Sequence, residues 1–246
     1  MRLKVLGSSS HGNCYILDNG KEALVIEAGI HPFEVTKALN FDIRRVSGCL
    51  VSHEDGDHSR YLNWFYKYRI PCFMSQGTDD ALKIHSKGCT KIVKHNISKQ
   101  VGSFKVLPFD IQHDAAEPLG FIIEHSETGK VLFLTDTCYS KYIFHGLHNI
   151  LIECNYRLDI LDRNVKDGLV PVEARNRIIQ SHMSFETCLE TLKANDLIRV
   201  NNIVLIHLSN TNSNEKQFMD DIFYHTRKDV FVAKKGLNIE LYKTPF

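Results

Sequence analysis

Four potential metal ligands, His53, Asp55, Asp57 and His58, fall within six residues, directly after an apolar segment of the chain. Val46–Val51 has the composition of a buried strand, and the run that follows it reads His53-Glu54-Asp55-Gly56-Asp57-His58. Two imidazoles and two carboxylates crowded at the end of a buried strand would lose hydration, and the carboxylates would repel each other, unless a cation lies among them. The run therefore predicts a metal site, holding one cation or, as we expect, a pair.

Three further titratable residues also follow segments with the pattern of a strand. They are His113, Asp136 and His207. A single residue of this kind is usually a core histidine or a turn aspartate. Three of them in addition to the first run favour a shared site, because functional side chains gather at the ends of strands on a rigid scaffold.

The order of predicted elements favours an α/β protein with two sheets flanked by helices. The first half and the end of the chain are rich in strand patterns, and helical patterns lie between them, over 172–180, 184–195 and 215–224. A further helix is predicted to begin at Asp57 and to run through Phe65. We find no repeat, linker or low-complexity tract, so the 246 residues are expected to form one domain, 1–246.

Composition excludes several classes of protein. The net charge of +1 indicates no global basic field, although a local basic surface remains compatible with it. The seven cysteines are odd in number and form no CxxC pair, which argues against a zinc ribbon or a disulfide framework. We expect a cytoplasmic protein with no membrane association, because the start of the chain lacks a signal-peptide pattern and no apolar run reaches 18 residues.

These motifs resemble the metallo-β-lactamase superfamily, in which an HxHxDH motif after a strand is followed by an isolated His, an isolated Asp and a final His. Within the superfamily, the chain is most similar to the YycJ (WalJ) type of DNA- and RNA-processing hydrolases. The matching segments are 7–14, 113–118, 135–137, 152–155, 182–184 and 207–209. The resemblance implies an αββα sandwich, with two mixed β-sheets flanked by helices.

The resemblance also implies a set of seven ligands for two divalent metal ions. The first ion would be bound by His53, Asp55 and His113, the second by Asp57, His58 and His207, and both by Asp136 as a bridge.

Two residues depart from the family pattern. Asp55 stands where the family usually has histidine, and its harder carboxylate shifts the preference from zinc towards manganese or magnesium. It could also weaken the first site. Glu27 stands where the family usually has aspartate, and we interpret it as a tolerated structural variant.

The resemblance assigns catalytic roles to Asp57 and His182, and substrate contacts to Ser9, Asn13 and His182. A metal-activated hydroxide would attack phosphorus, so no protein nucleophile is needed. His182 would contact a phosphate or donate a proton to the leaving oxygen. The alternatives are a surface or capping role for His182, and the orientation of a ligand or an ordinary loop role for Asn13. Glu153 either supports a ligand histidine or is an ordinary strand-end charge.

Three functions are compatible with the sequence. The first is a metal-dependent phosphodiesterase, a DNA exonuclease of 5′-to-3′ polarity as the resemblance implies, with DNA favoured over RNA as partner. The second is a small-molecule hydrolase of the same fold, acting on a thioester, a lactone or a cyclic phosphodiester. The third is a catalytically weakened relative that only binds nucleic acid, because Asp55 replaces a histidine. The sequence leaves the metal (zinc, manganese or magnesium) and the oligomeric state open.

Overall fold

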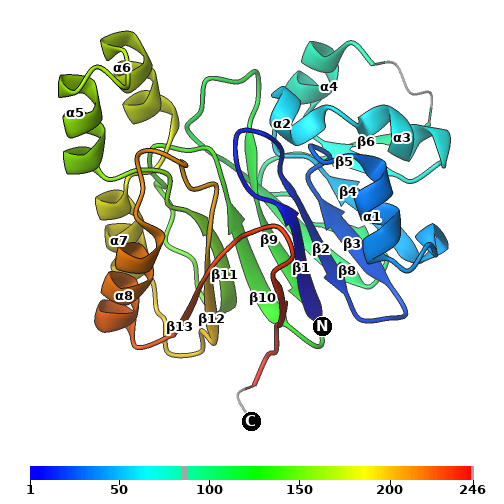
Figure 1. Ribbon diagram of the computed structural model, residues 1–246. Coiled ribbons are helices and arrows are strands. Elements are labelled where there is room, and N and C mark those ends of the chain that lie inside the picture. The colour runs from blue at the N-terminus through cyan, green and yellow to red at the C-terminus, as the bar shows by residue number, and fades with distance from the viewer. Residues whose placement is uncertain (85–87, 245–246) are drawn as a thin grey trace.

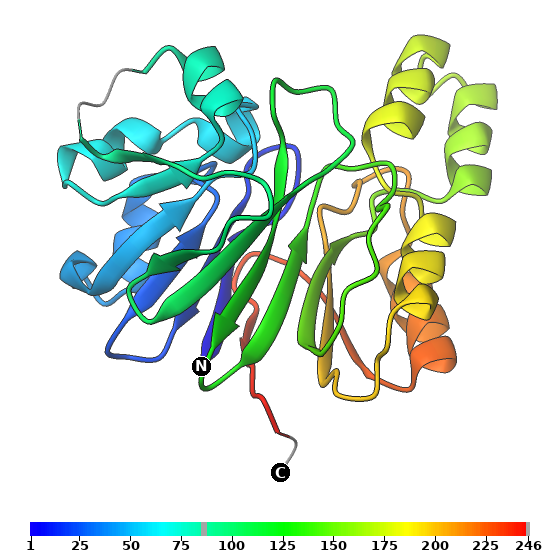
Figure 2. The ribbon, with the colours of Figure 1, turned by 180° about the vertical axis from the view of Figure 1, so that it is seen from behind.

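Two seven-stranded sheets pack face to face, and helices cover their outer faces (Figures 1 and 2). The computed structural model describes residues 1–84 and 88–244. Helices α1 to α4 lie on one side of the sandwich, and helices α5 to α8 lie on the other (Figure 1). The predicted fold class, two mixed sheets flanked by helices, is confirmed.

The first sheet consists of β14 (Asn238–Glu240), β1 (Arg2–Gly7), β2 (Cys14–Asp18), β3 (Ala23–Ile26), β4 (Val46–Leu50), β5 (Cys72–Met74) and β6 (Thr90–Ile92), in this order. Neighbours are antiparallel from β14 to β3 and parallel from β3 to β6. Helices occupy the connections between the parallel strands, namely α1 (Pro32–Ala38), α2 (Gly56–Ser59), α3 (Leu62–Lys67) and α4 (Gln76–Leu82).

The second sheet repeats this arrangement. Its order is β13 (Asp229–Val232), β12 (Asn202–Ile206), β11 (Leu147–Glu153), β10 (Gly129–Leu134), β9 (Leu119–His125), β8 (Phe104–Asp110) and β7 (Lys99–Val101). Neighbours are parallel from β13 to β10 and antiparallel from there to β7. Its helices are α5 (Leu158–Lys166), α6 (Val172–Ser181), α7 (Phe185–Ala194) and α8 (Glu215–Thr226).

Apolar side chains fill three layers. Tyr15 and Phe133 are in edge-to-face contact between the two sheets, in a cluster that also holds Phe104 and Phe121. Two further clusters lie between each sheet and its own helices. Every residue of β11 and β12 is buried, which explains why residues 150–152 and 203–206 are continuous apolar runs and not alternating ones.

The prediction of one helix from Asp57 through Phe65 is wrong in one respect, because the structure has two helices there, α2 and α3. The break falls at Tyr61, whose N–H donates to the carbonyl of Ala28 at 2.9 Å and so leaves the helical pattern. Helix α5 and the short strands β6 and β7 were not predicted from the sequence. In α5, Leu161 is the buried residue.

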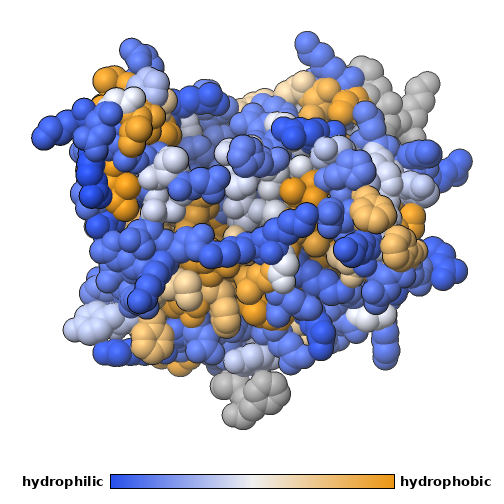
Figure 3. Space-filling model, in the orientation of Figure 1, coloured by the Kyte–Doolittle hydropathy of each residue, from blue (hydrophilic) through white to orange (hydrophobic). Residues whose placement is uncertain are grey.

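Hydrophilic residues cover most of the face seen in Figure 3, and apolar residues show at its upper left, over α5 and α6. Leu158, Leu169 and Val172 are exposed in this region. Within residues 1–84 and 88–244, no helix is long and apolar enough to cross a membrane.

Candidate metal centre

The metal-binding run predicted from the sequence forms a loop and one turn of helix after β4. Ser52 and His53 are completely buried, and Asp55 precedes α2 as its N-cap residue. The N–H of His58 donates to the carbonyl of Asp55 at 2.9 Å, so the turn presents Asp57 and His58 towards the second sheet. Gly29 packs against this turn. A Cβ atom at Gly29 would lie 1.7 Å from the carbonyl oxygen of Asp57, so only glycine fits there.

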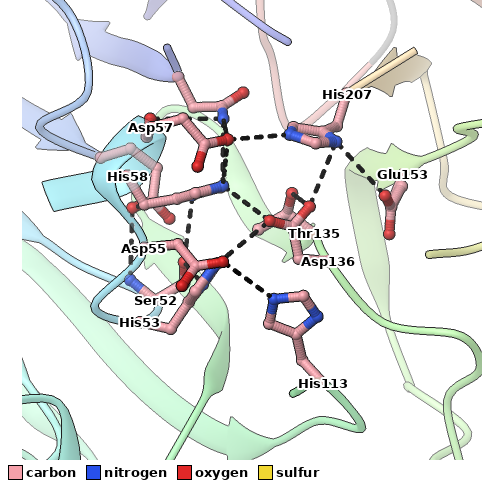
Figure 4. A network of polar contacts seen from close by, with 12 residues as sticks. Ser52, His53, Asp55, Asp57, His58, His113, Thr135, Asp136, Glu153 and His207 are labelled. Atoms are coloured by element: carbon pink, nitrogen blue, oxygen red, sulfur yellow. Dashed lines mark hydrogen bonds and ion pairs between the residues drawn. The ribbon is translucent and has the colours of Figure 1, made fainter. Parts of the chain in front are cut away.

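The structure brings all seven predicted ligands together (Figure 4). We call them the histidine–aspartate cluster; its members are His53, Asp55, Asp57, His58, His113, Asp136 and His207. The four members between His53 and His58 follow β4 of the first sheet. The other three, His113, Asp136 and His207, follow β8, β10 and β12 of the second sheet. β8, β10 and β12 run in the same direction, so their C-terminal ends lie at the same end of the second sheet.

The first group within the cluster is His53, Asp55 and His113. The Nε2 atoms of His53 and His113 lie 3.7 and 3.6 Å from Oδ2 of Asp55. Both Nε2 atoms are buried and make no hydrogen bond to any described residue. Ligand atoms at about 2.1 Å from one tetrahedral cation are about 3.4 Å apart. The spacing and the two unpartnered nitrogens therefore fit a bound cation, since a buried polar atom without a partner is costly.

The second group is Asp57, His58, Asp136 and His207. Oδ2 of Asp57 lies 3.3 Å from Nε2 of His58 and 3.3 Å from Nε2 of His207. Oδ2 of Asp136 lies 2.7 Å from Nε2 of His58 and 3.4 Å from Nε2 of His53. Asp136 therefore faces both groups, as a bridging carboxylate would. These four residues also fit a cation, by the number and kind of their donors.

Neighbouring side chains hold the cluster in place. Nδ2 of Asn13 donates to Oδ2 of Asp57 at 3.0 Å, and Asn13 is completely buried. Oγ of Ser52 is 2.8 Å from Nδ1 of His53. A carboxylate oxygen of Glu27 is 3.4 Å from Nδ1 of His58. Contacts of this kind fix the ring orientation of metal-binding histidines and raise their basicity.

Three of the nine non-glycine residues with a positive φ in the described ranges lie at the same place. Glu27, Asp136 and His207 have φ angles of 67°, 45° and 54°, in the left-handed region that residues other than glycine rarely adopt. Such angles persist only where the surrounding structure imposes them, and they gather at functional sites. Here they lie at the ends of three strands that supply cluster residues or their supports.

His182 lies beside the cluster and not on a remote surface. Its Nδ1 atom is 2.7 Å from Oε1 of Glu153, and its ring stacks on that of His207 with centroids 5.3 Å apart. Glu153 is completely buried and accepts the N–H of Thr137 at 2.9 Å. The His182 side chain is 22% exposed, and Nδ1 is the ring nitrogen that Glu153 contacts.

The electrostatics of the cluster favour charged forms. Burial alone would lower the pKa of His207, but the carboxylates of Asp136, Asp57 and Glu153 outweigh burial and raise it to about 10. The pKa values of His58 and His113 are raised for the same reason. A proton therefore occupies the His207 imidazole of the metal-free cluster at neutral pH, and a cation that binds there must displace it.

The other predicted site residues occupy different positions. Asn13 lies behind Asp57, so it supports a cluster residue and does not face the solvent. The carbonyl of Ser9 accepts a hydrogen bond from Nδ2 of Asn13 at 3.1 Å, and Ser9 is half-buried at the edge of the site. The supports Ser8 and Ser52 were missed. Ser8 accepts the N–H of His207 at 2.8 Å; the one signal for Ser52 was its position directly before His53.

Comparison with known proteins agrees with this geometry. A family model described as the metallo-beta-lactamase superfamily matches residues 9–88. The match includes the run at residues 53–58, and the two-sheet sandwich and the cluster are those expected of a hydrolase with this fold. The resemblance drawn from the sequence is thus confirmed.

Two curated relatives carry a more specific name. The chain is 29% identical to exodeoxyribonuclease YycJ of Bacillus anthracis over 230 residues, which is 87% of this chain and 84% of the relative. It is 26% identical to exodeoxyribonuclease WalJ of Streptococcus pneumoniae over 261 aligned residues, which is 99% of this chain and 94% of the relative. Among solved structures, YhfI of Bacillus subtilis, a metallo-beta-lactamase fold protein, matches with a TM-score of 0.72 at 16% identity, over 97% of this chain and 99% of YhfI.

Proposed function

We propose that this protein is a metal-dependent phosphodiesterase that degrades DNA as an exonuclease, in the 5′-to-3′ direction. The observation that carries the proposal is the pair of ligand groups that meet at Asp136. Two cations held side by side suit an in-line displacement at phosphorus, since they stabilise both the attacking and the leaving oxygen. The exodeoxyribonuclease names of the two curated relatives support DNA as the substrate.

Asp57 and His182 would have different roles in this reaction. Bound metal ions would supply a Lewis acid for the phosphate and lower the pKa of a water molecule. Asp57 would act as a ligand whose orientation is fixed by Asn13. His182 would donate a proton from Nε2 to the leaving oxygen, and the contact between its Nδ1 atom and Glu153 would keep the ring in that orientation.

The proposed metal ions are divalent, and the first group favours manganese or magnesium over zinc. In the first group, the carboxylate of Asp55 takes the place of a softer imidazole. Hard oxygen ligands suit manganese and magnesium better than they suit zinc. Asp55 is 40% exposed, so this group is also the one nearer to solvent. Metal analysis of the purified protein would test the proposal. Two tightly bound ions are expected, whereas less than one ion, with no hydrolysis of any phosphodiester, would favour the weakened binding relative.

A small-molecule hydrolase is the second candidate. It would need a closed pocket with apolar walls, whereas an open, polar groove suits nucleic acid. A groove of about 480 Å³ lies next to the cluster, where Ser8, which accepts the N–H of His207, is one of its lining residues. Its polar and charged lining also includes Ser9, His11, Ser209, Glu215, Lys234 and Lys235. This lining favours the phosphodiesterase. Hydrolysis of a thioester or a lactone, with none of DNA, would reverse the preference.

The direct test is incubation of the protein with end-labelled single- and double-stranded DNA and manganese. We expect stepwise release of nucleotides from the 5′ end. The variant Asp57→Ala should lose this activity, whereas Asp220→Ala, which removes an exposed carboxylate of α8, should retain it. Cleavage that survives Asp57→Ala would contradict the proposal.

A further inference from the structure

A groove lined by unpaired cations lies at the opposite end of the second sheet from the histidine–aspartate cluster. It has a volume of about 490 Å³, and we call it the far basic groove. Its charged lining residues are Arg199, Arg227, Lys228, Lys243 and Asp229. Four cations thus face one carboxylate, in a chain whose net charge is only +1.

None of the four cations forms an ion pair with a carboxylate within the described ranges 1–84 and 88–244. Nζ of Lys228 donates to the carbonyl of Ile198 at 3.3 Å, and the guanidinium of Arg227 lies 5.1 Å from the ring centre of Tyr224. Neither contact neutralises charge. By contrast, Lys4 and Arg45 both contact Asp18, and Lys141 contacts Asp110. The far basic groove therefore offers positive charge that its own surroundings leave uncompensated.

His148 has a pKa that is lowered by burial and by the positive charge of the far basic groove. It lies buried at the lining of the groove, where burial lowers the pKa of its imidazole and the charges of Lys243 and Arg199 lower it further. A histidine beside a positive potential stays neutral at pH 7. The charges of Lys243 and Arg199 therefore act together at His148, and an anion placed in the groove would be attracted by both.

An edge strand connects the far basic groove to the catalytic end. β13 is the outermost strand of the second sheet; it begins at Asp229 in the far basic groove and ends at Val232. Val232 and the next residues, through Lys235, line the open groove beside the cluster. Lys234 and Lys235 also pair with carboxylates there, Glu215 and Glu34, but all four side chains are at least 32% exposed, so solvent screens these pairs.

We propose that the far basic groove binds the phosphodiester backbone of a nucleic acid strand whose end lies at the histidine–aspartate cluster, and that the strand runs along β13 between the two. The proposal rests on the proposed function. His148 and Glu153 stand near the two ends of β11, five residues apart, which corresponds to about 17 Å of strand. At about 3.4 Å per stacked nucleotide, a bound strand must be at least about five nucleotides long to reach both places.

The test compares two triple variants. Arg199→Gln, Lys228→Gln and Lys243→Gln together remove three cations of the far basic groove and leave Arg227, which ends α8. The control triple variant, Lys21→Gln, Lys67→Gln and Lys216→Gln, removes three exposed lysines elsewhere. The probe is a 20-nucleotide single strand with phosphorothioate linkages, which resist hydrolysis, and binding to the manganese-loaded protein is measured by fluorescence anisotropy at several salt concentrations.

We expect the groove variant to lose the salt dependence that three phosphate contacts produce. Between 50 and 200 mM salt the wild-type protein and the control should lose about 20-fold more affinity than the groove variant. A dinucleotide should bind equally to all three proteins. Hydrolysis of a small chromogenic phosphodiester should also be unchanged, so a fault in the catalytic centre would be recognised separately.

Two results would overturn the proposal. One is equal affinity of the groove variant and the control for the 20-nucleotide strand. The other is binding of a mononucleotide that depends on the same three cations, since the groove would then hold a free nucleotide and not a strand. If the wild-type protein binds the strand through these cations but hydrolyses no DNA, the proposed function fails while the groove assignment stands.

Discussion

Each imidazole of the histidine–aspartate cluster has its Nε2 atom near a cluster carboxylate and its Nδ1 atom near a further polar group. Nδ1 of His113 contacts the carbonyl of Ser181 at 3.2 Å, and Nδ1 of His207 lies 3.5 Å from Oε1 of Glu153. Rotation of either ring would lose the contact at Nδ1. The geometry needed to bind a metal ion is thus set by the protein before any ion arrives.

The Asn13 amide is expected to act through Asp57. Asn13→Ala removes the hydrogen bond to Oδ2 of Asp57 and should lower the affinity for the second metal ion about 10- to 100-fold. Competition with a chromogenic chelator measures this affinity. Asn176→Ala, at an exposed position of α6, is the control. A substrate contact at Asn13 would instead raise KM and leave the metal affinity as in the wild type.

His182 is expected to matter only when the leaving oxygen needs a proton. His182→Asn should lower kcat on DNA by about 10²- to 10⁴-fold, the range typical of general acid catalysis. On a phosphodiester with p-nitrophenol as leaving group, the same substitution should change kcat little, and metal content should be unchanged. His225→Asn, at an exposed position of α8, is the control. An equal loss on both substrates would identify a structural role.

At the scale of elements, an ion-pair cluster joins the first two strands to the segment before β4. Lys4 of β1 and Arg45 of the 3₁₀ turn Ile43–Arg45 approach the carboxylate of Asp18 on β2 to 2.8 and 2.6 Å. Burial by itself raises the pKa of Asp18, but the hydrogen bonds from Arg45 and Lys4 outweigh it and lower the pKa to about 2. The contact therefore stabilises the fold only while Asp18 is ionised.

Asp18→Asn should reduce the free energy of unfolding by about 2 kcal/mol at pH 7. The folded pKa lies below the ordinary value of 3.8, so the contribution is complete above about pH 4 and disappears as the pH falls towards 2. Urea unfolding between pH 2 and 7 measures the difference. Asp42→Asn serves as control, because its partner Arg44 is 88% exposed and the pair should contribute little. A difference that is constant with pH would contradict this account.

The sequence predicted the strands and the cluster better than it predicted the connections. Apolar segments and the polar residues directly after them are local signals, and they identified all seven members of the cluster. The break at Tyr61 depends on the carbonyl of Ala28, more than 30 residues away, so no local pattern contains it. Asn13 was expected to orient substrate or a ligand; the structure places it against Asp57, and its burial depends on how the loop before β2 packs on α2.

At the scale of the whole molecule, the cluster joins the two sheets. His53, Asp55, Asp57 and His58 follow a strand of the first sheet, and His113, Asp136 and His207 follow strands of the second. In the absence of a cation, carboxylates from both sheets approach one another with protons as the compensating charge. Any ion bound there would therefore stabilise the contact between the two sheets.

Removal of metal should lower the thermal stability of the protein. At a free metal concentration 100-fold above Kd, binding contributes about 2.7 kcal/mol, and a chelator should abolish this contribution and lower Tm. Differential scanning calorimetry with and without the chelator measures the shift. Asp136→Ala lacks the carboxylate that faces both groups, so its Tm should respond much less. An identical wild-type Tm in both conditions would argue against a structural contribution of the metal.

The order of the cluster residues along the chain has a consequence for biosynthesis. The first group is complete once residue 113 has left the ribosome, whereas the second waits for His207, which follows β12. Until the later half of the chain has been made, Asp57 and His58 lack two of their companions. Capture of a full complement of ions must therefore come after translation is nearly finished, and an early ion of the wrong kind could enter only the group that contains Asp55.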